Sequence, residues 1–203
     1  IDGDLTLTSG HVSGITDSGT VTVGGNLTAT TDDNNGVIDL GTLAVDGEMA
    51  LTTHTGGAAT VVNDAGIDFA ASTVRGALHA TATAGIIEQS GALTITGATT
   101  IVARTSDNIV LNNTSNDFAG VSITSGANVT LVDANMIQLN ASTVSGTYAV
   151  TSTAGDITDG GVLDITGAST FTVANGKSII LNEPSTFSGA VEFAASGGGT
   201  ILS

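Results

Sequence analysis

The sequence feature that most limits how this chain can fold is a long internal repeat. Residues 71–112 return at 141–182 with one constant offset, and about half of the positions are identical. Ala-Ser-Thr-Val at 71–74 returns at 141–144, and Ile-Thr-Gly-Ala at 95–98 returns at 165–168. A more divergent copy precedes them, so the internal repeats run near 1–70, 71–140 and 141–203 of a single domain that covers 1–203. Such a long and regular repeat indicates an architecture in which each unit buries its neighbour.

Within each repeat, pairs of apolar residues with one residue between them predict short strands with one buried face. The pairs often begin eight residues apart, and Gly, Asn, Asp and Ser fill the intervals as turn formers. Eight residues hold a strand of about five residues and a turn of about three, which is too short for a crossover helix. The pairs are Leu5/Leu7, Val21/Val23, Leu93/Ile95, Ile109/Leu111, Val121/Ile123, Val129/Leu131, Ile137/Leu139, Leu163/Ile165, Phe171/Val173 and Ile179/Leu181.

Two folds suit short alternating strands: an antiparallel sandwich or barrel, and a parallel β-helix. The repeat favours the β-helix, because every coil of a solenoid faces a copy of itself, whereas each strand of a sandwich has its own neighbours. We therefore predict an all-β parallel β-helix (β-solenoid) of about nine coils of roughly 20–25 residues, with about three coils in each repeat. Its core must be aliphatic, since only 3% of the residues are aromatic.

Charge and composition exclude several partners. The chain has 3 Lys and Arg against 19 Asp and Glu, for a formal net charge of −16. Such a surface repels phosphate backbones, so we expect no nucleic-acid binding, and it disfavours anionic membranes and polyuronates as well. No apolar run approaches the roughly 20 residues of a membrane-spanning helix, so we expect no membrane insertion. The absence of cysteine excludes disulfides and thiolate metal sites.

Four segments, residues 90–100, 116–123, 127–131 and 141–146, carry a resemblance to a known family. Units such as Ser-Gly-Ala-Leu-Thr-Ile-Thr-Gly at 90–97 and Asn-Asp-Phe-Ala-Gly-Val-Ser-Ile at 116–123 resemble the repeats of bacterial large exoproteins, the filamentous-haemagglutinin-like adhesins. The resemblance covers essentially the whole chain. It implies a right-handed parallel β-helix stalk outside the bacterial cell, and it implies no catalytic residues. Because the sequence starts inside the repeat pattern, we expect it to be a piece of a longer polypeptide.

Acidic residues provide the main candidates for chemistry. Paired carboxylates hydrolyse glycosides when they lie about 5–9 Å apart, and Asp/Asn turns can bind Ca²⁺ through oxygen ligands. The three groups are Asp32-Asp33-Asn34-Asn35, Asp156 with Asp159, and Asp39 with Asp46 and Glu48. Neither an EF-hand loop nor the glycine–aspartate nonapeptide of calcium-binding β-rolls is present. We expect solvated turns, with a weak Ca²⁺ site as an alternative, while a cluster of the third group in a groove would favour an enzyme.

Other polar residues give weaker signals. His11, His54 and His79 share no spacing, so we predict no metal-binding, cofactor-binding or catalytic residues and no cofactor. Asn112 and Asn182 end matching strands and are predicted to form amide ladders in stacked coils. Threonine pairs raise ice binding as an alternative, but they do not recur at one constant coil spacing, and threonine is an ordinary residue of exposed strands. These pairs are Thr6/Thr8, Thr20/Thr22, Thr28/Thr30 and Thr94/Thr96.

Two functional hypotheses follow from different classes. The first is an extracellular structural and adhesive β-helix, a non-catalytic stalk segment of a large surface-exposed or secreted bacterial adhesin. Its partners would be neighbouring β-helix segments and, through the adhesin, host or neighbouring-cell surfaces or glycans. The alternative is a filament subunit that stacks end to end with identical subunits through open coil edges. A carbohydrate-active β-helix enzyme is a distant third.

Overall fold

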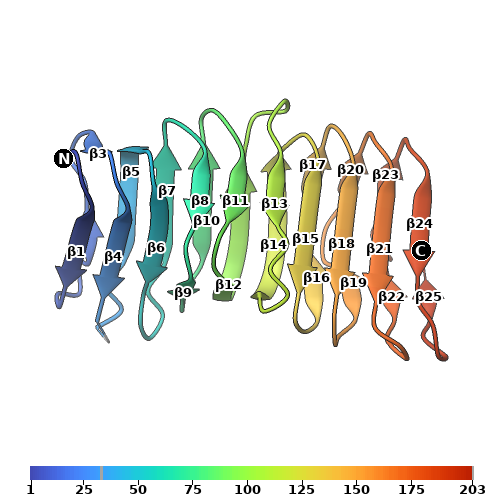
Figure 1. The fold of residues 1–203 in the computed structure, drawn as a ribbon. Helices are drawn as coiled ribbons and strands as arrows, with labels where there is room; N and C mark the ends of the chain where they lie inside the picture. Colours follow the sequence, from blue (N-terminus) through green and yellow to red (C-terminus); the bar gives the residue numbers. More distant parts are fainter. Residues whose placement is uncertain (33, 203) are drawn as a thin grey trace.

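The chain forms a right-handed β-solenoid of about nine turns in which all paired strands are parallel (Figure 1). The computed structural model describes residues 1–32 and 34–202. In Figure 1 the strands of the near side run downward, those of the far side run upward, and the chain advances from left to right. In the part of the chain that the structure describes, no helix has the length and apolar character needed to cross a bilayer. The predicted fold class is confirmed.

The near side is one continuous column of strands, each paired with the next along the rod. Backbone register is kept from one end of this column to the other, so each strand is the template for the next. Its members are β1 (Leu5–Ser9), β4 (Leu27–Thr31), β6 (Glu48–Thr52), β8 (Ile67–Phe69), β11 (Ile87–Gln89), β13 (Ile109–Leu111), β15 (Val129–Asp133), β18 (Tyr148–Ser152), β21 (Ser169–Val173) and β24 (Val191–Ala194).

The far side is a second continuous column. The length of chain between paired residues of this column varies: it is short at the Val121↔Leu139 pair and longer at the Ile15↔Ile38 pair. Its members are β2 (Ile15–Thr16), β5 (Ile38–Val45), β7 (Ala59–Asn63), β10 (Leu78–Ala82), β12 (Leu93–Val102), β14 (Asp117–Ser125), β16 (Ile137–Leu139), β19 (Ile157–Asp159), β22 (Ile179–Ile180) and β25 (Ile201–Leu202).

Short edge strands join the two columns, and they change sides along the rod. In Figure 1 β3 lies at the upper edge, β9 at the lower edge, and β17, β20 and β23 at the upper edge again. The first change occurs beside β6, which pairs with two shorter strands of the next turn. Its first residues pair with β8 and its last residue pairs with β9, and the chain bends between β8 and β9. The edge strands are β3 (Val21–Val23), β9 (Ser72–Val74), β17 (Ser142–Val144), β20 (Leu163–Ile165) and β23 (Thr186–Phe187).

Each repeat contains three and a half turns, where the sequence predicted about three. Starting at Leu78 on the far column, the chain completes one turn at Thr99, a second at Val121 and a third at Leu139. A further half turn brings it to Tyr148 on the near column. Tyr148 is the residue of the next copy that corresponds to Leu78. Equivalent strands of consecutive copies thus lie on opposite sides of the rod, as β8 and β16 or β13 and β22 do.

The core runs along the axis between the two columns. The predicted apolar pairs point inward, and from Val23 to Leu181 their side chains are at most 6% exposed. Aromatic residues are few, and they gather near the carboxyl-terminal end, where the Phe171 ring packs edge-on against Tyr148 and stacks on Phe193. Apart from these residues and the buried Phe69 and Phe118, the core is aliphatic, and removing its apolar surface from water is the main stabilising contribution.

Side-chain oxygens at the corners bind the backbone of the following turn. The Oδ1 atom of Asn26 accepts a hydrogen bond from the N–H of Glu48 (2.9 Å), and that of Asn108 accepts one from the N–H of Asn128 (3.1 Å). The Asn108 and Asn128 side chains also stack through a 3.1 Å hydrogen bond. Amide stacking therefore occurs, but not between Asn112 and Asn182, which follow strands on opposite columns.

Candidate functional site

The carboxylates of Asp39, Asp46 and Glu48 do not form one cluster. Asp39 lies in β5 on the far column, where its backbone pairs with Thr16 and Thr60. Asp46 lies in the turn that follows β5, and Glu48 begins β6 on the near column. The sequence favoured an enzyme only if these three carboxylates shared one groove. They do not share one.

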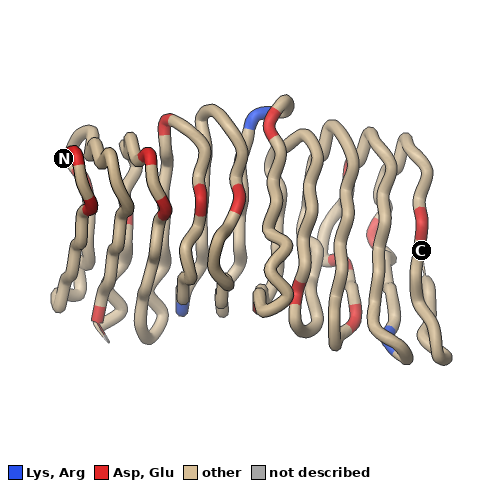
Figure 2. Tube along the Cα trace, in the orientation of Figure 1, with Lys and Arg blue, Asp and Glu red and all other residues tan. Residues whose placement is uncertain are grey.

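Strand pairing instead places Glu48 in a row with Asp68 and Glu88, two carboxylates that were not among the candidates from the sequence. Glu48 pairs with Asp68, and Asp68 pairs with Glu88, so three acidic side chains lie on neighbouring strands. We call these three residues the acidic file; in Figure 2 acidic positions mark adjacent turns on the amino-terminal half of the near column. Neighbouring strands are about 4.8 Å apart, and like charges opposite each other are destabilising.

The acidic file borders a shallow hollow of about 210 Å³. Asp68 and Glu88 line it together with Asp46, and the described residues that line it include no Lys or Arg. The Oδ1 atom of Asp68 is buried and has no hydrogen-bond partner among the described residues. Burial, and secondarily the Glu48 carboxylate, raise the pKa of Asp68 above its ordinary value, while the backbone N–H of Ser90 lowers it. This arrangement disfavours the ionised form of Asp68, and no basic side chain among those lining the hollow compensates for it.

The other acidic groups hold backbone amides. Oδ1 of Asp156 accepts a hydrogen bond from the N–H of Ser178 (2.7 Å), and both Asp159 oxygens accept bonds from the N–H groups of Asn182 and Glu183 (2.9 and 3.1 Å). These carboxylates therefore fasten one turn of the solenoid to the next. A Ca²⁺ ion would have to compete with these bonds for the same oxygens.

The first acidic group, at 32–35, is a local turn. Asp32 accepts hydrogen bonds from the backbone N–H and the side-chain amide of Asn34 (3.1 and 2.8 Å), which is an Asx turn. Asp33, a member of this group, lies outside the described residues. Among residues 1–32 and 34–202, no three His, Cys, Asp or Glu side chains are arranged to hold a metal ion.

The three histidines lie at separate places. Nδ1 of His11 accepts a hydrogen bond from the N–H of Ser13 (3.1 Å), and Nδ1 of His54 lies 2.7 Å from the carbonyl oxygen of Thr31. His79 is exposed on β10 of the far column. The structure thus offers no shared geometry for these rings.

Two serines of the repeat make the same pair of hydrogen bonds, one in each copy. The Ser72 hydroxyl accepts from the N–H of Leu51 and donates to the carbonyl of Ala70 (3.0 and 2.9 Å). The Ser142 hydroxyl does the same with Ile123 and Asn140 at the same distances. Each serine satisfies an amide that loses its strand partner where an edge strand begins. The Ala-Ser-Thr-Val motif therefore marks the position at which the edge strand changes sides.

A second equivalent pair, Asn63 and Asp133, is fully buried and differs in charge. The Asn63 amide donates to the carbonyls of Val45 and Gly66 (3.0 and 2.7 Å) and accepts from the N–H of Val45. The Asp133 carboxylate only accepts, from the N–H groups of Phe118 and Asn135, at 2.7 Å each. Burial raises the pKa of Asp133, although these two amides oppose the shift.

Two of the four threonine pairs, Thr6/Thr8 and Thr28/Thr30, stack on each other despite their uneven sequence spacing, whereas Thr22 pairs with Ala44 and Thr94 with Asp117. Thr6 and Thr8 pair with Thr28 and Thr30, and Thr30 pairs with Thr52. Successive turns contain different numbers of residues, but the extra residues lie in the connecting segments, so the strands stay in register. Constant spacing in the sequence is therefore not required for stacking.

Comparison with known proteins yields one match. A family model described as "Repeats of unknown function (DUF5649)" matches residues 56–125 and 126–194, two adjoining segments that make up most of the chain. No curated protein and no solved structure matches the chain.

Proposed function

The chain belongs to this family of repeats, and from that premise we propose that it is a stalk segment of a large bacterial surface protein, an extracellular rod with no catalytic activity. The observation that carries the proposal is the continuity of the two strand columns. Both columns run through the two copies of the repeat with their register kept, and nothing in this arrangement limits the number of copies that can follow one another. Such a rod spans distance in proportion to its number of turns.

Composition supports an exposed, extended role. The net charge of −16 keeps rods apart and soluble, and the resemblance of segments such as 90–97 and 116–123 to adhesin repeats supports a location outside the cell. In this proposal the adhesin carries its ligand-binding regions elsewhere, and the contacts of the stalk are with the β-helix segments before and after it.

The experiment is to detect the native polypeptide in extracts of the cells that encode it, with an antibody raised against this segment. A stalk predicts a denatured mass far above 19.7 kDa and loss of the signal when intact cells are treated with protease. A band near 19.7 kDa, or a large polypeptide that protease reaches only after lysis, would contradict the proposal.

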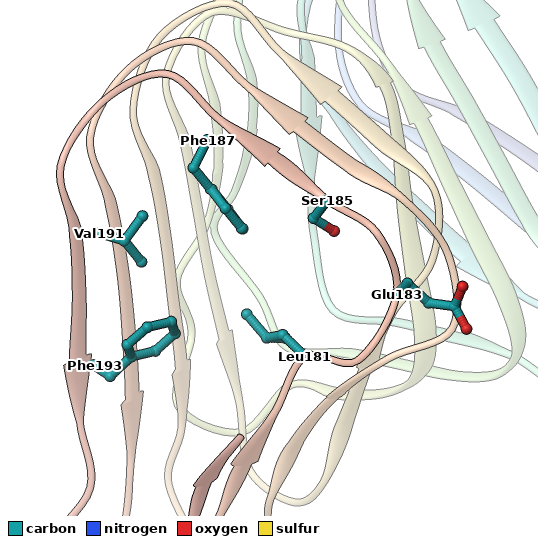
Figure 3. Close-up of a pocket in the computed structure, with 6 residues that line it drawn as sticks. All are labelled: Leu181, Glu183, Ser185, Phe187, Val191 and Phe193. Atoms are coloured by element: carbon teal, nitrogen blue, oxygen red, sulfur yellow. The ribbon is translucent and has the colours of Figure 1, made fainter. Parts of the chain in front are cut away.

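A filament subunit is the second candidate, and its contact with another copy would lie at the carboxyl-terminal turn. At the carboxyl-terminal end an apolar hollow of about 340 Å³ opens between Leu181, Phe187, Val191 and Phe193 (Figure 3). A following turn would cover these side chains, whether it belongs to the same chain or to another copy. In a filament, the first turn of a second molecule would cover them, with its near-column strand β1 beside β24.

The two candidates differ in how the isolated chain behaves. A filament subunit of 203 residues forms longer particles as its concentration rises, and Phe193→Asp, which puts a charge into the hollow, abolishes them. A stalk segment stays monomeric over the same range. Analytical ultracentrifugation separates the two outcomes.

A further inference from the structure

Outward-facing residues of the second copy form a regular array on the near column. Thr130 and Val132 pair with Ala149 and Thr151 on the next turn. On the turn after that, Ala149 and Thr151 pair with Thr170 and Thr172. All six side chains are partly buried, as in a closely packed sheet face. We call these six residues the near threonine array.

The first copy carries the equivalent array on the far column. Its residues, which correspond to those of the near array in the repeat, are Thr60, Val62, His79, Thr81, Thr100 and Val102, and they are paired in the same way. We call them the far threonine array. Because each copy contains three and a half turns, the two arrays face opposite sides of the rod.

The near array has the dimensions of a two-dimensional lattice. Neighbouring turns are about 4.8 Å apart along the rod, and residues i and i+2 of one strand are about 6.6 Å apart across it. The hydroxyls of Thr130, Thr151, Thr170 and Thr172 have no hydrogen-bond partner among the described residues. Each hydroxyl can both donate to and accept from water, and each γ-methyl group adds a small apolar surface beside it.

The lack of charge on the near threonine array limits which partners it can bind. The six near positions carry no charge in a chain whose net charge is −16, so a charged partner has nothing to pair with on this face. The aromatic side chains on which sugar rings stack are turned inward: Phe69, Phe118, Phe171 and Tyr148 are fully buried. An uncharged lattice of hydroxyl-like groups that needs no aromatic platform fits this face, and the surface of ice has that chemistry.

We propose that the threonine arrays bind ice. Water molecules bonded to the hydroxyls and held beside the methyl groups adopt the regular spacing of the array, and these molecules join the ice lattice. This inference goes beyond the stalk proposal, which gives the rod no ligand of its own. The two fail separately, because a stalk without ice affinity remains a stalk.

The first test uses the 203-residue chain with a fluorescent label at its amino terminus. Slow growth of a single ice crystal in a dilute solution should incorporate the labelled chain into the ice, and ice recrystallisation should be inhibited. An acidic globular protein of similar mass is the negative control. Exclusion of the chain from the crystal to the same degree as this control overturns the proposal, and so does binding to microcrystalline cellulose or chitin in place of ice.

Variants locate the surface. Thr151→Lys removes the centre of the near array, and Thr81→Lys removes the equivalent position of the far array. Each single variant should keep part of the incorporation, and the double variant should keep less than either, while the stacked threonines of β1, β4 and β6 stay unchanged in all three. Thr143→Lys, on the exposed edge strand β17, is the matched control and should behave as the unmodified chain.

Circular dichroism and the melting temperature of each variant establish that the solenoid is intact. A folded double variant that enters ice as well as the unmodified chain overturns the assignment of the surface, and a loss of ice binding in Thr143→Lys does so as well.

Discussion

The two copies of the repeat, 56–125 and 126–194, keep isoleucine at three inward positions and differ at neighbouring outward ones. Ile67, Ile87 and Ile109 return as isoleucines at 137, 157 and 179, and all six are buried. The outward residues Asp68 and Glu88 return as Gln138 and Thr158. The inward residues and the serine at each edge-strand junction determine the shape of the rod, whereas the outward positions are free to differ in chemistry.

The comparison also bears on the acidic file, whose Asp68 and Glu88 lie in the first copy and whose Glu48 precedes it. Equivalent residues lie on opposite columns, so the near column changes from acidic in turns that contain Glu48, Asp68 and Glu88 to neutral in turns that contain Thr130 and Thr170. The rod therefore has unlike surfaces along one side even though it is built from a repeated unit.

The largest effect is expected from exchanging the buried polar residues that the two copies do not share. Asn63→Asp replaces two amide donors with a carboxylate that faces the carbonyls of Val45 and Gly66. A buried charge without a partner should cost about 3–5 kcal/mol. Urea unfolding at pH 7 measures the loss. The reverse exchange, Asp133→Asn, removes a buried carboxylate but turns an NH2 donor toward one of the two backbone N–H groups that Asp133 accepts from, so it should cost less, about 1–3 kcal/mol; equal losses would contradict the different bonding of the two sites.

A core substitution at equivalent leucines should show how the end of the rod differs from its middle. Leu111→Ala opens a cavity in a fully buried site and should cost about 2–5 kcal/mol. Leu181 already borders the open hollow at the carboxyl-terminal end, so Leu181→Ala creates less new cavity and should cost less. Equal losses in thermal unfolding would mean that the hollow is closed in solution, by a second molecule or by rearrangement.

The two junction serines should behave alike. Ser72→Ala and Ser142→Ala each leave one amide and one carbonyl without a partner, which should cost about 1–3 kcal/mol. The two sites lie in different turns, so the double variant should lose the sum of the two effects. Thr73→Ala, which removes an outward side chain next to Ser72, is the control and should have a much smaller effect. If one serine proves neutral, the two junctions are not equivalent.

The acidic file should make stability depend on pH, and this is the smallest expected effect. The folded-state pKa of Asp68 is raised, so the folded chain holds a proton that the unfolded chain has released. Stability should therefore be highest below the unfolded value near 3.8 and fall as the pH rises through the folded pKa.

Asp68→Gln places the residue of the second copy at this position and should flatten that part of the profile. Gln138→Asp is the matched opposite change. Chemical unfolding between pH 3 and pH 7 provides both profiles, and an unchanged slope in Asp68→Gln would show that Asp68 is not the group responsible.

The strands and the core could be predicted from the sequence because they depend on local alternation. Pairs such as Val129/Leu131 and Ile137/Leu139 identify their strands and their buried faces directly. The half turn between copies could not be predicted, because it depends on how the strands of each copy divide among turns of unequal length. The half turn arises where the edge strand changes sides, as it does where β6 pairs with both β8 and β9.

The acidic file could not be predicted from the sequence without knowing which strands pair and in which register. Glu48, Asp68 and Glu88 are separated by one solenoid turn each in the sequence, and only the pairing of β6, β8 and β11 brings them together. The same kind of pairing shows that Thr6 and Thr8 stack on Thr28 and Thr30. A search for acidic or threonine residues at variable spacings of one turn length would have found both features.

A distance measurement between spin labels would test the half turn most directly. The chain has no cysteine, so labels can be placed in pairs of choice. Thr81→Cys with Thr151→Cys labels equivalent positions of the two copies, and Val110→Cys with Glu192→Cys labels two near positions four turns apart. The axial separations are about 17 Å for the first pair and about 19 Å for the second.

Double electron–electron resonance should give the longer distance for the 81/151 pair, because its labels project from opposite sides of the rod. A shorter distance for the 81/151 pair than for the 110/192 pair would place equivalent residues on one side. That result would contradict the relation between the copies on which this account rests.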